Sequence, residues 1–355
     1  MALDRVGVGT SWLVAVLMGA TSIACTFDNG GTSFDGGADA ETDDGGRRAD
    51  ATVDARPKVS DEVLDGLAAA TLVGEVNARA WARTSSAPEV FVTAILPIQQ
   101  ADKNQTDGEV CPVIAENGNT RTYTGGCTSS TAEAWFGSAT VTGPKVNGIP
   151  LSVTYDHFGH TGTTTCNTVV FATETRYTGT LLRGSALPLL PVDVDLKLGV
   201  KRPTTACVLE TAAVGFDYHM TIETGPDGNN DMTPDTRTWN GSGRAGKQSG
   251  ENAGLMSATT ASEVTGQACG SEALSGTTTL SAGGHTVVIT YDGASDCSNM
   301  STVQWSFDGV AQAAMTGVLC AIAAPGRRAG GAAGSTTLVL LGAFVLFRSV
   351  RRRQR

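Results

Sequence analysis

Residues 168–182 read TVVFATETRYTGTLL, and residues 192–200 read VDVDLKLGV. Over much of both segments, apolar or β-branched side chains recur at every second position, as in a β-strand with one buried face. Residues 214–223, VGFDYHMTIE, repeat the pattern. These three segments predict that the chain folds mainly as extended strands.

Shorter runs of the same kind, broken by Gly, Asp and Asn, fill the region from residue 86 to residue 320. They cover residues 90–95, 134–142, 151–155, 286–291 and 302–307. Strands at such spacing, without helices between them, are typical of antiparallel architectures rather than β–α–β units. We therefore expect a mainly β fold, an antiparallel multi-stranded sheet or sandwich.

One helix is expected before this region, over residues 58–85. Ser60 is a suitable N-cap, Asp61 and Glu62 place negative charge in the first turn, and apolar residues follow at three-to-four spacing. Residues 25–57 are rich in Gly and Asp and contain few large apolar residues. This composition predicts a disordered, acidic tether.

Six cysteines lie in the body of the chain: Cys111, Cys127, Cys166, Cys207, Cys269 and Cys297. No CxxC pair occurs, so disulfides in an exported protein are favoured over a zinc site. Six cysteines allow 15 pairings. Their order favours three sequential bridges, namely Cys111 with Cys127, Cys166 with Cys207, and Cys269 with Cys297.

Two segments match each other in sequence. Tyr123, Cys127 and Trp135 in the first correspond to Tyr291, Cys297 and Trp305 in the second, and the cysteine-to-tryptophan spacing is identical. We expect two copies of a disulfide-closed hairpin unit, with the aromatic residues in the core. The alternative interpretation makes a carbohydrate-stacking platform of Trp135, Trp239 and Trp305.

The first 24 residues have the pattern of an export signal, with Arg5 ahead of an apolar stretch from Val6 to Ala20. Ser22-Ile23-Ala24 followed by Cys25 resembles a bacterial lipobox, although Ser22 stands where leucine is favoured. The resemblance implies lipidation of Cys25. Plain cleavage after Ala24 is the alternative. A retained transmembrane helix is less favoured than either, because ~15 apolar residues are too few to span a bilayer.

The last 35 residues contain a Pro/Gly/Ala-rich spacer, an apolar segment over residues 338–347 and a cluster of arginines that ends at Arg355. With Cys320, they resemble a myxobacterial C-terminal sorting signal, which implies proteolytic removal of the tail near that cysteine. The alternative is a permanent single-pass transmembrane helix held by the positive-inside rule. Both interpretations place the body outside the cytoplasm, at the outer membrane or the cell surface.

Charge limits the partners of the body. With the two end segments set aside, 17 basic residues face 34 acidic ones, a net charge of −17. Such a surface repels phosphate backbones, so we expect no nucleic-acid partner. The expected partners are the membrane, reached through lipid or the C-terminal helix, and envelope glycans or proteins.

Two motifs offer metal ligands. Asp227, Asn229, Asp231 and Asp235 are spaced much as an EF-hand calcium loop begins, but Met232 replaces its glycine and Thr238 its glutamate. A polar hairpin turn explains the same residues. His157 and His160 could chelate zinc with a third ligand, yet a polar loop accounts for them equally well. We therefore expect no cofactor, and calcium at the Asp227 loop is the alternative.

Catalytic motifs are missing from the sequence. It contains no G-x-S-x-G elbow and no P-loop, and the expected disulfides leave no cysteine to act as a nucleophile. The sequence therefore predicts a non-catalytic, surface-anchored envelope lipoprotein with a structural or adhesive role. The alternative is a secreted hydrolase of polysaccharide or peptide, working through two carboxylates outside any motif.

Overall fold

The computed structural model describes residues 57–146, 149–185, 189–204, 206–225, 236–266, 273–291 and 302–316. Its helices are α1 (Asp61–Leu64), α2 (Glu75–Ser85) and α3 (Ala87–Thr106). Its strands are β1 (Val113–Asn117), β2 (Thr120–Thr124), β3 (Cys127–Thr128), β4 (Ala134–Thr142), β5 (Ser152–Cys166), β6 (Val169–Arg183), β7 (Leu189–Pro203), β8 (Leu209–Thr224), β9 (Thr236–Lys247), β10 (Gly254–Gly266), β11 (Ala273–Ala282), β12 (His285–Thr290), β13 (Thr302–Phe307), β14 (Val310–Ala311) and β15 (Met315–Thr316).

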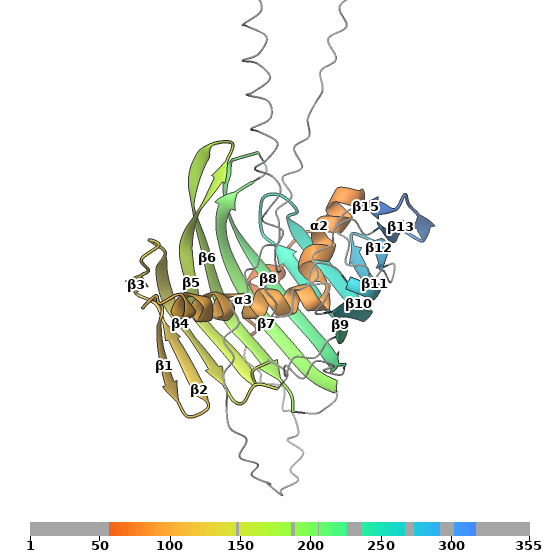
Figure 1. Cartoon of the computed structure of the whole chain (residues 1–355). Coiled ribbons are helices and arrows are strands. Elements are labelled where there is room, and N and C mark those ends of the chain that lie inside the picture. Colours follow the sequence, from red (N-terminus) through yellow and green to blue (C-terminus); the bar gives the residue numbers. More distant parts are fainter. Residues whose placement is uncertain are drawn as a thin grey trace, which may run out of the picture.

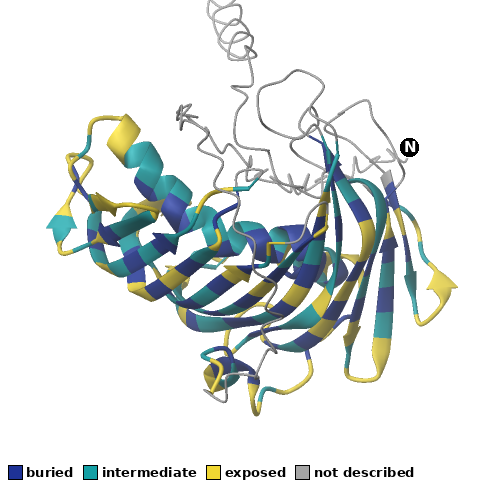
Figure 2. Cartoon of the chain, turned by 90° about the horizontal axis from the view of Figure 1, so that it is seen from below, coloured by how far each residue is buried: buried dark blue, intermediate teal, exposed yellow. Residues whose placement is uncertain are grey.

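The strands form one antiparallel sheet in which almost every strand pairs with its neighbours in the chain. The order runs β1-β2-β4-β5-β6-β7-β8-β9-β10-β11-β12-β13-β14, while β3 adds to β4 and β15 to β13. Buried and exposed residues alternate along the long central strands, as Figure 2 shows. The predicted mainly β, antiparallel fold is confirmed, as a single sheet.

Helix α3 crosses the strands on the concave side of this strongly curved sheet (Figure 1). Its buried side chains include Val90, Ala94, Ile98 and Ala101, which repeat at the three-to-four spacing of one helix face. That face covers β5 to β9. The hydrophobic core therefore lies between α3 and the inner face of the sheet.

Helix α1 lies on the opposite, convex face. Gly215 and Asp217 of β8 alternate with the inward-facing Phe216 and Tyr218, so they point outward. A β-carbon at Gly215 would come within 2.9 Å of the Leu64 side chain, so the missing side chain makes room for α1. The Asp195 carboxylate on the same face accepts hydrogen bonds from the Val59 and Ser60 amides.

The single helix predicted over residues 58–85 is wrong, because the segment forms two separate helices, α1 and α2. Between them Gly66 and Gly74 adopt φ of +82° and +89°, and Ala69 forms a parallel β-bridge with Leu255 of β10. Helical backbone requires negative φ, so these glycines interrupt the helix.

The strand predicted over residues 90–95 is also wrong, since these residues lie inside α3. Pro88 occupies the first turn of the helix, where a missing N–H is harmless. The β-branched residues there favoured a strand in isolation, but the buried face of α3 provides the stronger preference. The β region therefore begins at Val113 and not at residue 86.

The two sequence-matched segments do not have equivalent registers. Trp135 pairs with Cys127 of β3, four residues after Tyr123. Trp305 pairs with Ile289 of β12, two residues before Tyr291. The matching sequence spacing therefore does not extend to matching strand pairing, although both tryptophans are buried.

Candidate functional site

A buried carboxyl group, that of Glu263, stands out on the inner face of the sheet because a β-bulge puts it there. Along β10, Thr260 is buried, Ala261 and Ser262 are both exposed, and Glu263 and Thr265 are buried. Strand pairing shifts register at this point on both sides of β10. The extra residue reverses the alternation, so Glu263 faces inward at the position where an unbroken strand would place Ser262.

Neighbouring strands hold this bulge in place. Ser262 adopts φ +49°, and its amide donates a hydrogen bond to Oδ1 of Asn240 in β9 at 2.8 Å. Gly276 of β11 has φ +97°, and a β-carbon there would lie 2.3 Å from the Ser262 carbonyl oxygen. Only glycine fits that close approach without a backbone shift.

Two glutamates meet in this region. Glu263, 2% exposed, accepts a hydrogen bond at Oε2 from the Thr278 hydroxyl at 3.0 Å. Burial raises the pKa of Glu263 to about 8. Burial, and then the nearby Glu263, raise the pKa of Glu89 in the first turn of α3, while Arg83 opposes the rise. At neutral pH, Glu263 is therefore mainly a neutral acid, able to donate a proton or a hydrogen bond.

The packing above this acid pair restricts access to it. The Ala87 amide at the start of α3 donates to the Thr260 hydroxyl at 2.9 Å, and the Phe91 ring packs on Trp239 with centroids 5.3 Å apart. The Trp239 indole in turn donates to the Thr265 hydroxyl at 2.8 Å. Glu263 itself is 2% exposed, so a substrate has little access to its carboxyl group.

A second candidate site lies on the surface, where a disulfide joins the ends of two hairpins. Cys166 ends β5 and bonds to Cys207 in the β7–β8 turn, with Cα atoms 5.6 Å apart. Asn167 and Thr168 close the β5–β6 hairpin with positive φ at both positions, which matches the right-handed twist of the strands. In the other turn, the Thr204 carbonyl accepts a hydrogen bond from the Cys207 amide at 2.9 Å.

We call residues 163–172 and 202–209, without Thr205, the stapled tip. Its exposed apolar side chains are Val169, Val170, Val208 and Leu209, with exposed fractions of 54, 64, 64 and 43%. Val169 pairs with Cys166, and Val208 adjoins Cys207, so an exposed aliphatic residue lies beside each bridged cysteine. Figure 1 shows the β5–β6 hairpin projecting well beyond the level of α3.

Charge is unevenly distributed around this tip. Residues 161–173 and 199–209 contain no Asp or Glu, but they contain Lys201 and Arg202. The first acidic residues, Glu174 and Glu210, lie opposite Lys201 and Arg202 in the neighbouring strands. In a body with a net charge of −17, the stapled tip is thus an apolar and basic surface.

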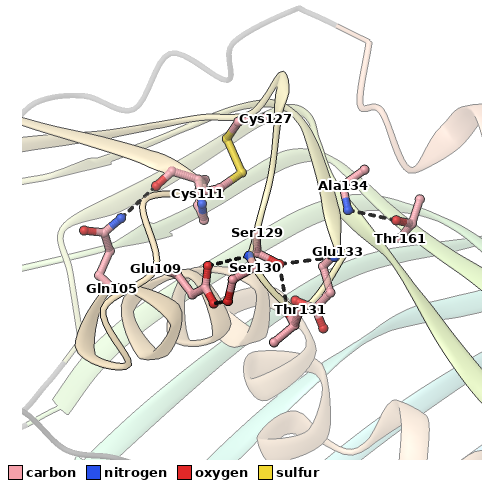
Figure 3. Close-up of a disulfide and its surroundings, with 11 residues drawn as sticks. Gln105, Glu109, Cys111, Cys127, Ser129, Ser130, Thr131, Glu133, Ala134 and Thr161 are labelled. Atoms are coloured by element: carbon pink, nitrogen blue, oxygen red, sulfur yellow. Dashed lines mark hydrogen bonds between the residues drawn. A yellow bond between two sulfur atoms is a disulfide. The ribbon is translucent and has the colours of Figure 1, made fainter.

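Of the predicted bridges, Cys111–Cys127 and Cys166–Cys207 are confirmed. The first holds the segment after α3 against the first strands (Figure 3), with Cα atoms 5.8 Å apart. Beside it Gln105 donates to the Pro112 carbonyl at 2.9 Å, and the Glu109 carboxylate accepts from the Ser130 amide at 2.7 Å. The remaining predicted site residues lie outside the described ranges: Cys25, Cys269, Cys297, Cys320, Asp227, Asn229, Asp231 and Asp235.

The two histidines considered for zinc are not brought together. His157 is exposed and contacts the Asp156 carboxylate at 2.7 Å. His160 is half-buried, lies 3.0 Å from the Gln100 side-chain oxygen, and stacks on Trp135. The described residues contain no group of three or more metal-binding side chains.

The proposed carbohydrate platform is not present on the surface. Trp135, Trp239 and Trp305 are 2, 1 and 8% exposed, so they belong to the core as the architectural interpretation expected. Sequence reasoning missed Glu89 and Glu263, because no motif surrounds either residue. The acid-free segments of the tip were visible in the sequence, but only the fold brings them together.

Within the described ranges, no helix combines the length and the apolar character needed to cross a bilayer. No protein-family model matches the chain, and neither curated proteins nor solved structures give a significant match. Function must therefore be argued from the geometry of the two candidate sites.

Proposed function

We propose that the chain is an exported, envelope-anchored lipoprotein that acts by binding rather than catalysis, with the stapled tip as its contact surface. The observation that carries the proposal is the Cys166–Cys207 bond. It fixes exposed aliphatic side chains at the end of two hairpins, away from the core between α3 and the sheet. A preformed surface of this kind suits binding, because little conformational freedom is lost on contact.

Export and anchoring are supported by chemistry at several places in the chain. Stable disulfides form in oxidising compartments, and two are present among the described residues. The N-terminal segment that ends at Cys25 resembles a lipoprotein signal, and the segment after Cys320 resembles a sorting signal. We expect palmitate to label the native protein and not a Cys25→Ala variant. Label retained in that variant would contradict anchoring through Cys25.

Binding is favoured over hydrolysis by the positions of the acidic groups. The Glu263 carboxyl is buried, whereas the aliphatic residues of the tip are open to solvent. The hydrolase alternative needs two carboxyl groups in one region, and Glu89 and Glu263 are the pair that can be tested. Turnover of a polysaccharide or peptide by the full chain, abolished by Glu263→Gln, would replace binding with hydrolysis as the function.

Site-specific photocrosslinking in cells tests the contact surface directly. A photoreactive amino acid is placed at Val170, and in a matched control at Val310, which is equally exposed at 64%. We expect adducts with envelope components, either lipid or protein, from position 170 and not from position 310. Equal yields at the two positions would contradict the assignment of the tip as the contact surface.

A further inference from the structure

The stapled tip combines two properties, exposed aliphatic side chains and basic side chains. Its four exposed aliphatic residues lie at the ends of two hairpins that one disulfide joins. Lys201 and Arg202 lie at the base of the tip, in register with Glu174 and Glu210, although neither basic side chain makes an ion pair with another described residue. Apolar side chains bordered by basic ones are the pattern of segments that enter a bilayer interface.

Charge selects the kind of surface that this tip can approach. An anionic bilayer repels a body with a net charge of −17 in most orientations. Residues 161–173 and 199–209 carry no acidic side chain, and the first ones, Glu174 and Glu210, lie opposite Lys201 and Arg202. The outermost part of the tip therefore presents no negative charge to the bilayer. Attraction of Lys201 and Arg202 acts within a Debye length, about 8 Å at physiological salt.

The backbone of the stapled tip is also held in a fixed conformation. The two-residue turn at Asn167 and Thr168, the Thr204 hydrogen bonds and the disulfide hold the aliphatic residues outward without a partner. A flexible loop would fold these side chains back onto the sheet. Here the fold itself keeps these side chains exposed, so they are available to contact an apolar environment outside the protein.

From these observations we infer that the stapled tip docks on a lipid bilayer with anionic headgroups, inserting Val169, Val170, Val208 and Leu209 at the interface. This inference rests on the proposed binding function and names its partner. The lipid-facing side chains enter the boundary between headgroups and acyl chains, while Lys201 and Arg202 contact headgroup phosphates.

Tryptophan quenching tests the docking in the full chain reconstituted in vesicles. Val170→Trp places a reporter at the tip, and Val310→Trp places one at an equally exposed position elsewhere. Both variants share the same ends, and position 310, which is nearer in sequence to the C-terminal segment, shows how much quenching anchoring alone produces. With brominated anionic phospholipids we expect the added emission at position 170 to fall by about twofold or more, and that at position 310 to remain.

Two further arms test the role of charge and of folding. Quenching at position 170 should decrease in zwitterionic brominated vesicles, and also when Lys201→Glu and Arg202→Glu are added. Val208→Trp, also at a 64% exposed position, should repeat the result and guards against misfolding of one variant. Equal quenching at positions 170 and 310, or equal quenching in anionic and zwitterionic vesicles, would overturn the inference.

The two proposals fail in different ways. Protein adducts from position 170 in cells, together with no selective quenching in vesicles, would retain the binding function and overturn lipid as its partner. Lipid adducts together with selective quenching support both. The absence of adducts and of selective quenching would overturn both proposals.

Discussion

The Thr260 hydroxyl in β10 accepts the hydrogen bond of the Ala87 amide at 2.9 Å, and so caps α3 from a strand 173 residues away. Ser86, the residue before the helix, makes no side-chain capping hydrogen bond. The first turn of α3 is therefore held by the sheet and not by its own sequence. Glu89 lies in the same turn and is influenced by the charge of Glu263, so the helix cap and the two acids belong to one region of the fold.

Replacing Thr260 by valine should destabilise the fold by about 2 kcal/mol, because a buried amide loses its acceptor while the side-chain volume is kept. Chemical denaturation measures the loss. Thr260→Ser keeps the hydroxyl and should recover most of the stability. Thr259→Val, at the exposed neighbouring position, should change it little. Equal losses at positions 259 and 260 would contradict the capping role.

Replacing Gly276 by alanine should cost about 3 kcal/mol or more. The new β-carbon would meet the Ser262 carbonyl oxygen at 2.3 Å, and φ +97° is strained for alanine. Gly199→Ala in β7 is the control, because its nearest neighbours lie at 3.7 Å or beyond. Thermal unfolding compares the two variants, and similar melting temperatures would contradict the tight packing at the bulge.

The long strands could be predicted from sequence because their alternation is local. Residues 192–200 carry their burial pattern in the order of the residues, and β7 follows it. The segment 90–95 carries a conflicting signal, since β-branched residues favour a strand while Val90, Ala94 and Ile98 fit a helix face. Contact with the sheet decides between the two, and a single sequence does not show that contact.

The candidate sites depend even more on distant residues. Glu263 faces inward only because a bulge reverses the alternation of β10, and that bulge depends on Gly276 and Asn240 in neighbouring strands. The stapled tip depends on Cys166 finding Cys207 across two hairpins. The order of the cysteines predicted this pair correctly, but the exposure of Val170 and Val208 follows from the turns that surround it.

Removal of the Cys111–Cys127 bridge by Cys111→Ser with Cys127→Ser should lower the free energy of unfolding by about 3 kcal/mol on the chain-entropy model. Cys166→Ser with Cys207→Ser opens a longer loop, and should lower the free energy of unfolding by about 4 kcal/mol on the same model. Denaturation of both double variants provides the comparison. Non-reducing peptide mapping that joins Cys111 to any cysteine other than Cys127 would contradict the first bridge.

The stability of the protein should fall as pH rises from about 4.5 towards 8, through the titration of Glu263. The pKa of this buried acid is about 8 in the folded protein, against 4.5 for an ordinary glutamate. Between those values the folded state binds more protons than the unfolded state, so raising the pH favours unfolding, by at most about 1.4 kcal/mol per pH unit for one group. The pKa of Glu89 is shifted in the same direction and adds to the effect, while Arg83 opposes that shift.

Glu263→Gln removes the charge and keeps the shape of the side chain. The free energy of unfolding of this variant should therefore vary less with pH and exceed that of the native chain at pH 8. Glu75→Gln, at an exposed position in α2, should leave the pH profile unchanged. Urea denaturation at several pH values between 5 and 8 measures all three proteins, and parallel profiles for the native chain and Glu263→Gln would show that Glu263 is not the group that titrates.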